Sequence, residues 1–143
     1  LEFYIATNAG EPLKPLTKIA SGGELSRIML SIKNVLADKD NVDTLIFDEV
    51  DTGISGSAAQ KVGKKLKQVS GGRQIICVTH LAQVAAYADN HLLISKNTEG
   101  GRTFTSVESL EKEGRVNELA RIMGGTMTEA LKKSAEELLE LSK

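Results

Sequence analysis

The stretch "DTLIFDE", residues 43–49, is a short apolar run that ends abruptly in two carboxylates. Such a run is typical of a strand that is buried on both faces of a sheet. Open α/β sheets bind their ligands at the carboxyl ends of their strands, which is where Asp48 and Glu49 are expected. Adjacent strand residues point in opposite directions, so the two side chains can serve different targets. The stretch therefore predicts an α/β fold with a polar site at one edge of its sheet.

Helix and strand patterns alternate on both sides of this stretch. Before it, "LEFYIAT" reads as a strand, and a helix is expected over residues 24–37 with one apolar face, made of Leu25, Ile28, Met29, Ile32 and Leu36. After it come a helix over 57–69, a buried strand "IICVT" and a short helix "LAQVAAYA". The alternation predicts a mainly parallel sheet flanked by helices.

The last third of the sequence predicts a hairpin and two helices. "HLLIS" and "TFTSVESL" are expected to be strands around the turn "NTEGGR". A helical face that includes Val116 and Leu119 stops at Gly124-Gly125, which is a natural helix end. Thr126 and Glu129 have the spacing of a capping box and are expected to open the final helix.

Composition excludes several classes of protein. The 143 residues carry 18 basic and 19 acidic side chains, so the chain does not bind nucleic acid with its whole surface. The lysine face of Lys61, Lys64 and Lys65 is expected to be solvated, with contact to DNA or a partner as the alternative. No apolar run approaches the ~18 residues of a membrane span, which predicts no membrane partner. The single cysteine, Cys77, is expected to be buried and inert.

Asp48 and Glu49 carry the sharpest chemical signal. One carboxylate can hold Mg²⁺ through its water shell, because this ion keeps most of its waters. The other can orient and deprotonate a water that attacks a phosphate. The alternative is a solvated strand end or a helix-cap acid.

His80 ends the next strand, in "VTH", and is expected at the same edge of the sheet. Its imidazole can bond a γ-phosphate or the attacking water, although a structural histidine has the same pattern. His91 has no such context and is interpreted as structural. Asp51, in the turn "DEVDTG", either bonds its own backbone or reaches a partner subunit, and spacing alone leaves both open.

The stretch "SGGELS", residues 21–26, opens a helix with an unusually bare first turn. Ser21 and Glu24 form a capping box, but Gly22 and Gly23 are not needed for it and each costs up to ~1 kcal/mol relative to alanine. A bare helix N-terminus is suited to a phosphate that approaches the backbone closely. The phosphate loop G-x-x-x-x-G-K-[ST] is nevertheless missing from the sequence, so that half of a nucleotide site must come from elsewhere.

Taken in order, these motifs over residues 1–143 resemble the C-terminal half of an ABC-type ATPase head. "SGGELS" (21–26) is similar to the signature motif, "TLIFDE" (44–49) to Walker B, residues 50–53 to the D-loop and His80 to the switch histidine. The compact "DEVDTGISG" and the tail "RVNELARIMGG" are similar to bacterial SMC-like DNA repair ATPases rather than to transporter subunits. Ala82 departs from the family, which usually has Pro there.

The resemblance implies a role for each motif. Asp48 would assist Mg²⁺ through water, Glu49 would be the general base and His80 would sense the γ-phosphate of ATP. The residues that would contact ATP on the opposing head are Ser21, Gly22, Gly23 and Glu24. Asp51 would cross the same interface.

The family also implies the missing parts. The Walker A half would lie in the N-terminal part of the same protein beyond a long antiparallel coiled coil, which would account for the abrupt start at Leu1. Two heads would pair as a homodimer on ATP in a cytoplasmic, nucleoid-associated ATPase that repairs and recombines DNA. The fragment alone is expected to be inactive. The alternatives are a piece of an ABC transporter nucleotide-binding subunit and a non-catalytic dimerisation module.

Overall fold

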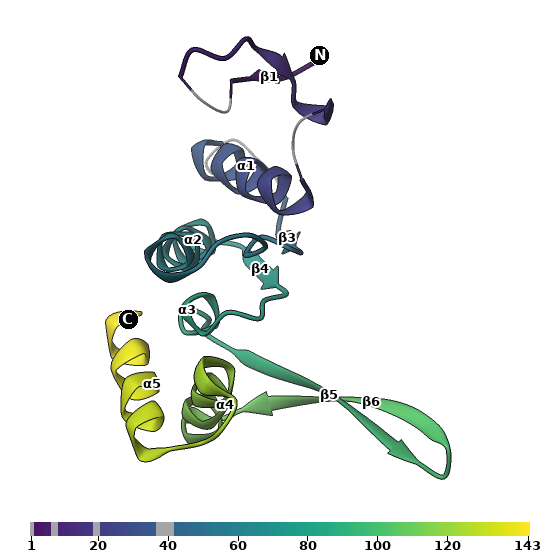
Figure 1. Ribbon diagram of the computed structural model, residues 1–143, viewed down its shortest axis with the longest axis vertical. Coiled ribbons are helices and arrows are strands. Elements are labelled where there is room, and N and C mark those ends of the chain that lie inside the picture. Colours follow the sequence, from purple (N-terminus) through teal and green to yellow (C-terminus); the bar gives the residue numbers. More distant parts are fainter. Residues whose placement is uncertain (1, 7–8, 19–20, 37–41) are drawn as a thin grey trace.

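The computed structural model describes residues 2–6, 9–18, 21–36 and 42–143. The part of the N-terminal strand prediction at Leu1 and Thr7, and the predicted helix end at Ala37, lie outside these ranges. The elements follow one another along the long axis of the molecule, from β1 at one end to α4 and α5 at the other (Figure 1). They are β1 (Tyr4–Ile5), β2 (Lys14–Pro15), a 3-10 helix (Leu16–Lys18), α1 (Gly22–Val35), β3 (Thr44–Phe47), α2 (Gly56–Val69), β4 (Gln74–Cys77), α3 (Ala82–Ala85), β5 (His91–Glu99), β6 (Arg102–Leu110), α4 (Lys112–Gly124) and α5 (Glu129–Leu141).

Three two-stranded sheets form among the described residues. β3 and β4 are parallel, with Thr44 opposite Gln74 and Phe47 opposite Cys77, whereas β1–β2 and β5–β6 are antiparallel. The prediction of a mainly parallel sheet is therefore wrong for the described part of the chain. The hairpin predicted in the last third of the chain is confirmed in β5–β6, where the two-residue turn Gly100–Gly101, with φ values of 57° and 77°, reverses the chain directly.

The β3–β4 pair is covered by helices on one face. Phe47 belongs to a buried cluster with residues of α1, α2 and α3, the other members being Leu30, Val50, Ala59, Leu66, Val69 and Val84. On the opposite face Ile46 is 70% exposed and Ile76 is 43% exposed. The prediction that the strand at 43–49 is buried on both faces is therefore wrong, because α1, α2 and α3 share a single face of the pair.

Helix α1 buries its predicted apolar face only in part, since Ile28 and Ile32 are half-buried. Leu25, Met29 and Leu36 of the predicted apolar face are 40–43% exposed, while the buried residues of α1 are Gly23 and Leu30. Ser26 and Arg27 are half-buried on that same side of the helix. The helix turns this side inward because Ser26 and Arg27 bond the loop after β3 and Gly23 lets that loop approach closely.

A second buried cluster joins the C-terminal helices to α3. It contains Ala82, Ala85, Ala86, Val116, Leu119, Ala120, Ala135 and Leu138. The predicted helix end is confirmed, because Gly125 follows α4 with a φ of 71°. The cap predicted at Thr126 is wrong: Thr126 belongs to the turn, and Thr128 caps α5 by accepting from Leu131 N at 3.3 Å.

The hairpin β5–β6 projects from the body between α3 and α4 (Figure 1). Its strands are longer than predicted and run up to the glycine turn. Among the described helices, none has the length and apolar character needed to cross a membrane.

Candidate functional site

The loop that follows β3 has an unusual backbone. Asp48 Oδ1 accepts from the backbone N–H of Glu49 at 2.8 Å, and Thr52 N–H donates to Glu49 O at 3.0 Å. Glu49 has a φ of 57°, and it is the only non-glycine residue in the described ranges with a positive φ. Such a conformation costs on the order of 1–3 kcal/mol and persists where its surroundings impose it, often at functional sites. The strain therefore falls on the residue that the sequence predicts to be the base.

Asp51 connects this loop to the end of β4. Its carboxylate is 2% exposed, and its Oδ2 accepts from Thr79 Oγ1 at 2.5 Å and from His80 N–H at 2.9 Å. The Nδ1 atom of His80 lies 3.2 Å from the same oxygen, while the His80 side chain is 71% exposed. Asp51 thus fixes the backbone and the ring of His80 within its own chain, and a contact of Asp51 across an interface stays a prediction.

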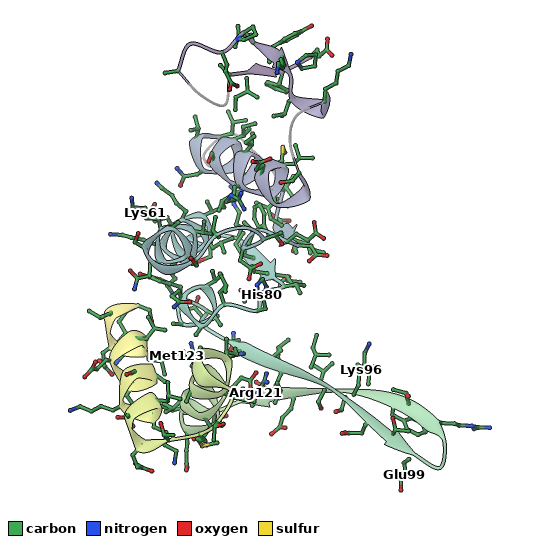
Figure 2. The ribbon with its side chains drawn as sticks, in the orientation of Figure 1. Lys61, His80, Lys96, Glu99, Arg121 and Met123 are labelled. Atoms are coloured by element: carbon green, nitrogen blue, oxygen red, sulfur yellow. The ribbon has the colours of Figure 1, made fainter. Side chains whose placement is uncertain are left out.

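The structure brings Asp48, Glu49, Asp51 and His80 to one edge of β3–β4, as their positions after the two strands predict. The pairing continues beyond the strands, because Val78 N–H donates to Phe47 O at 3.0 Å. Figure 2 shows His80 on the loop between β4 and α3. His91 lies at the start of β5, where burial and then the charge of Arg115 lower its pKa. This is in keeping with a structural role for His91.

The capping box at the start of α1 is confirmed. Ser21 N–H donates to Glu24 Oε2 at 2.9 Å, and Glu24 N–H donates to Ser21 Oγ at 3.4 Å. The hydrogen bond from the Ser21 backbone is the main cause that lowers the pKa of Glu24. Glu24 therefore serves its own helix, and a contact between Glu24 and nucleotide stays a prediction.

The two glycines of the first turn have different surroundings. A Cβ on Gly23 would lie 2.9 Å from Glu49 O, Thr52 O and Thr52 Cβ, so this glycine is required by the close approach of its own chain. A Cβ on Gly22 would meet the Glu49 carboxylate, which is the far end of a flexible side chain. The chain itself therefore accounts for Gly23, and a contact between Gly22 and a phosphate from outside stays a prediction.

This difference predicts opposite outcomes for two alanine variants. Gly23→Ala forces the loop backbone away from α1 and is expected to lower the free energy of unfolding by about 1–3 kcal/mol. Gly22→Ala only displaces a carboxylate and gains helix propensity, so it is expected to leave stability nearly unchanged. Urea denaturation of both variants beside the wild type measures the difference. Equal losses would contradict the packing described for Gly23.

Two residues of α1 join the site without having been predicted. Ser26 Oγ donates to Asp48 O at 2.7 Å, and Arg27 Nη1 donates to Thr52 O at 2.8 Å and to Val50 O at 3.3 Å. A helical projection places both residues on the Gly23 side, opposite the apolar stripe. The sequence does contain a signal for this contact, because the polar Ser26 and Arg27 lie on the same side of the helix as Gly23, which is unusual in a first turn.

Comparison with known proteins identifies the family. The chain is 52% identical over 143 residues to the DNA repair protein RecN of Halalkalibacterium halodurans, 51% over 141 residues to RecN of Bacillus subtilis and 49% over 140 residues to RecN of Treponema pallidum. These matches cover 97–99% of the chain. The chain belongs to the RecN family. It spans about a quarter of the length of these relatives, 24–25% in each case.

A solved structure has a fold similar to that of the chain. It comes from a study of ATP-driven dimerization and DNA-stimulated activation of SMC ATPases, and it matches with a TM-score of 0.56 at 21% identity. The match covers 88% of the chain and 74% of the solved one. The chain therefore has an α/β fold similar to that of an SMC ATPase head. No protein-family model matches the sequence.

The chain offers one carboxylate suited to Mg²⁺. Asp48 is exposed at the edge of β3, and the described residues contain no group of three or more His, Cys, Asp or Glu that could hold a metal ion. A single carboxylate fits Mg²⁺, which keeps several waters and takes further oxygens from a substrate's phosphates. A single carboxylate does not fit a metal ion whose ligands all come from the protein.

Two remaining side-chain predictions concern surface and core. Lys61, Lys64 and Lys65 are exposed on α2, which agrees with a solvated face, and Lys61 points outward in Figure 2. Cys77 is half-buried rather than buried, and burial, followed by the charges of Asp51 and Asp48, raises its pKa to about 12. The thiolate form of Cys77 is therefore scarce at neutral pH, which agrees with the predicted lack of reactivity.

Proposed function

We propose that the chain is the C-terminal lobe of the ATPase head of a RecN-type DNA repair protein and that it supplies half of a composite ATP site. One observation carries the proposal: the β3–β4 edge gathers Asp48, Glu49, Asp51 and His80, while the sequence has no phosphate loop. The exposed Ile46 and Ile76 on the uncovered face of β3–β4 give a Walker A lobe an apolar surface to cover. The RecN family and the SMC-like fold support ATP and Mg²⁺ as the ligands.

Each residue at this edge has a distinct role in hydrolysis. Asp48 holds Mg²⁺ through water, and the ion neutralises charge on the phosphates when it is bound. Glu49 orients and deprotonates the attacking water. His80, whose Nδ1 side is held by Asp51, presents Nε2 outward to the γ-phosphate. Asp51 therefore acts through His80 from within its own chain.

The first turn of α1 serves a second ATP. Its free N–H groups and the absence of a side chain at Gly22 favour the γ-phosphate of ATP bound to the opposing head, with Ser21 beside it. Two heads of the same protein pair in this way, and ATP is shared between the signature motif of one and the Walker motifs of the other. Gly23 and Glu24 support the turn, and the D-loop around Asp51 contacts the partner head.

The full-length protein contains the parts that this chain lacks. A Walker A half joined through a coiled coil completes the head, and DNA is engaged through the whole protein in double-strand-break repair and recombination in the cytoplasm, at the nucleoid. Relatives named as DNA repair proteins disfavour a transporter subunit. The strained Glu49 and the buried Asp51–His80 contact disfavour a non-catalytic dimerisation module, which needs neither.

Calorimetry tests whether the chain is half of a site. The full-length protein is expected to bind ATP in the presence of Mg²⁺, whereas the isolated chain is expected to give no measurable heat, because it has no loop or lysine to hold the β- and γ-phosphates. Circular dichroism of the same sample checks that the isolated chain is folded. Tight binding of ATP by the folded chain alone would refute the proposal.

A further inference from the structure

On the side of α1 that faces its own lobe, two polar side chains stand between the buried Gly23 and Leu30, and both bond backbone carbonyls. Ser26 and Arg27 lie there, one helical turn beyond the glycines of the first turn. We infer that Ser26 and Arg27 are positioning residues that hold the 48–52 loop so that Glu49 keeps its place, and that they link the first turn of α1 to that base. The inference rests on the proposed function, because it concerns the same ATP site.

The contacts cover alternate carbonyls of the loop. Ser26 bonds the carbonyl of Asp48, and Arg27 bonds the carbonyls of Val50 and Thr52. Of the two intervening carbonyls, that of Glu49 accepts from Thr52 N–H and that of Asp51 accepts from Ile54 N–H. Hydrogen bonds from a charged guanidinium are stronger than neutral ones. The positions of the three carbonyls therefore depend on two adjacent side chains of α1.

Glu49 needs this support because its backbone is strained. A residue with a φ of 57° returns to an ordinary conformation unless its neighbours are fixed. The bonds from Ser26 and Arg27 fix the residues on both sides of Glu49, and the bare Gly23 lets the helix lie close enough to do so. Losing the Arg27 bonds allows the loop to relax and displaces the Glu49 carboxylate.

The same contacts connect two sites. The first turn of α1 and the residues that hold the loop belong to one continuous 14-residue helix. A displacement of α1 when its N-terminus meets phosphate is therefore passed to the carbonyls at 48, 50 and 52. The position of Glu49 therefore depends on whether the first turn of α1 has bound the phosphate of the opposing head.

Variants of the full-length protein test this role. Arg27→Ala is expected to lower kcat about 10–100-fold, because a small misplacement of a catalytic group has effects of this size. The KM for ATP and the ATP-driven pairing of heads are expected to change less than about threefold. Arg27→Lys is expected to restore part of the rate, since the ammonium keeps the charge and the donors but lacks the rigid planar fork of the guanidinium. Ser26→Ala, which removes a single bond, is expected to lower kcat less and keeps the test valid if Arg27→Ala does not fold.

Arg115→Ala is the matched control. Arg115 also bonds backbone carbonyls, those of Ala86, Ala88 and Asp89, but these lie in the segment that follows α3. It is expected to lose stability in urea and keep its kcat. The inference is overturned if kcat of Arg27→Ala and Ser26→Ala stays within twofold of the wild type, or if Arg115→Ala loses kcat to the same extent. Glu49→Gln in the same series separates the proposed function from the positioning role. Turnover of ATP by Glu49→Gln refutes the proposed function. An inactive Glu49→Gln beside a fully active Arg27→Ala refutes the positioning role alone.

Discussion

Full-length protein that carries Glu49→Gln is expected to lose ATP turnover by about 10²–10⁴-fold, the usual contribution of a general base. The amide keeps the shape of the side chain and cannot take a proton from water. The left-handed backbone of Glu49 and its N–H bond to Asp48 do not involve the carboxylate, so the loop is expected to stay in place. ATP-driven pairing of heads is therefore retained, and the paired state accumulates because it cannot hydrolyse its ATP.

Two assays measure this outcome. Release of inorganic phosphate in the presence of Mg²⁺ gives the turnover, and light scattering with and without ATP gives the pairing. Glu99→Gln is the control, since Glu99 is an exposed carboxylate at the far end of the hairpin (Figure 2) and its loss is expected to change neither. Turnover by Glu49→Gln close to that of the wild type would mean that the base is another residue.

The edge of β3–β4 at which Asp48, Glu49 and His80 lie was predictable, because these residues come just after the two strands. Parallel pairing of β3 and β4 places the residues after Phe47 and Cys77 at the same edge, whatever covers the two faces. The placement of Asp48, Glu49 and His80 at one edge could therefore be predicted from local pattern alone. The direction of the Asp51 side chain could not, because it depends on Thr79 and His80, which lie 28 and 29 residues further along the chain.

The packing of α1 was the least predictable part of the fold. Hydrophobic periodicity marks Leu25 and Met29 as the inward face, yet both are largely exposed. Hydrogen bonds from Ser26 and Arg27 to a distant loop decide the orientation instead, and periodicity carries no information about such bonds. Sequence pattern also carries no information about which distant backbone approaches a glycine. The sequence therefore suggests an outside phosphate beside Gly23, where the structure has the backbone of Glu49 and Thr52.

The other errors have local causes. Strand pattern shows that two segments can pair but does not show which face is covered, so Ile46 was expected inside the molecule. At the start of α5, Thr126 and Thr128 are both possible caps, and the left-handed Gly125 puts Thr126 in the turn.

Reconstitution from two halves is expected to restore a function that neither half has. The isolated chain supplies Asp48, Glu49 and His80, and the Walker A half supplies the phosphate loop and its lysine. Neither is expected to release phosphate from ATP by itself. An equimolar mixture is expected to hydrolyse ATP in the presence of Mg²⁺, because the lobes reassemble over the exposed face of β3–β4.

The assay of this mixture is the most direct test of the composite site. Its control is the same mixture with the Glu49→Gln chain, which should assemble and remain inactive. The account predicts Mg²⁺-dependent phosphate release from the wild-type mixture alone. Phosphate release by the isolated chain, or equal release from the Glu49→Gln mixture, would contradict it.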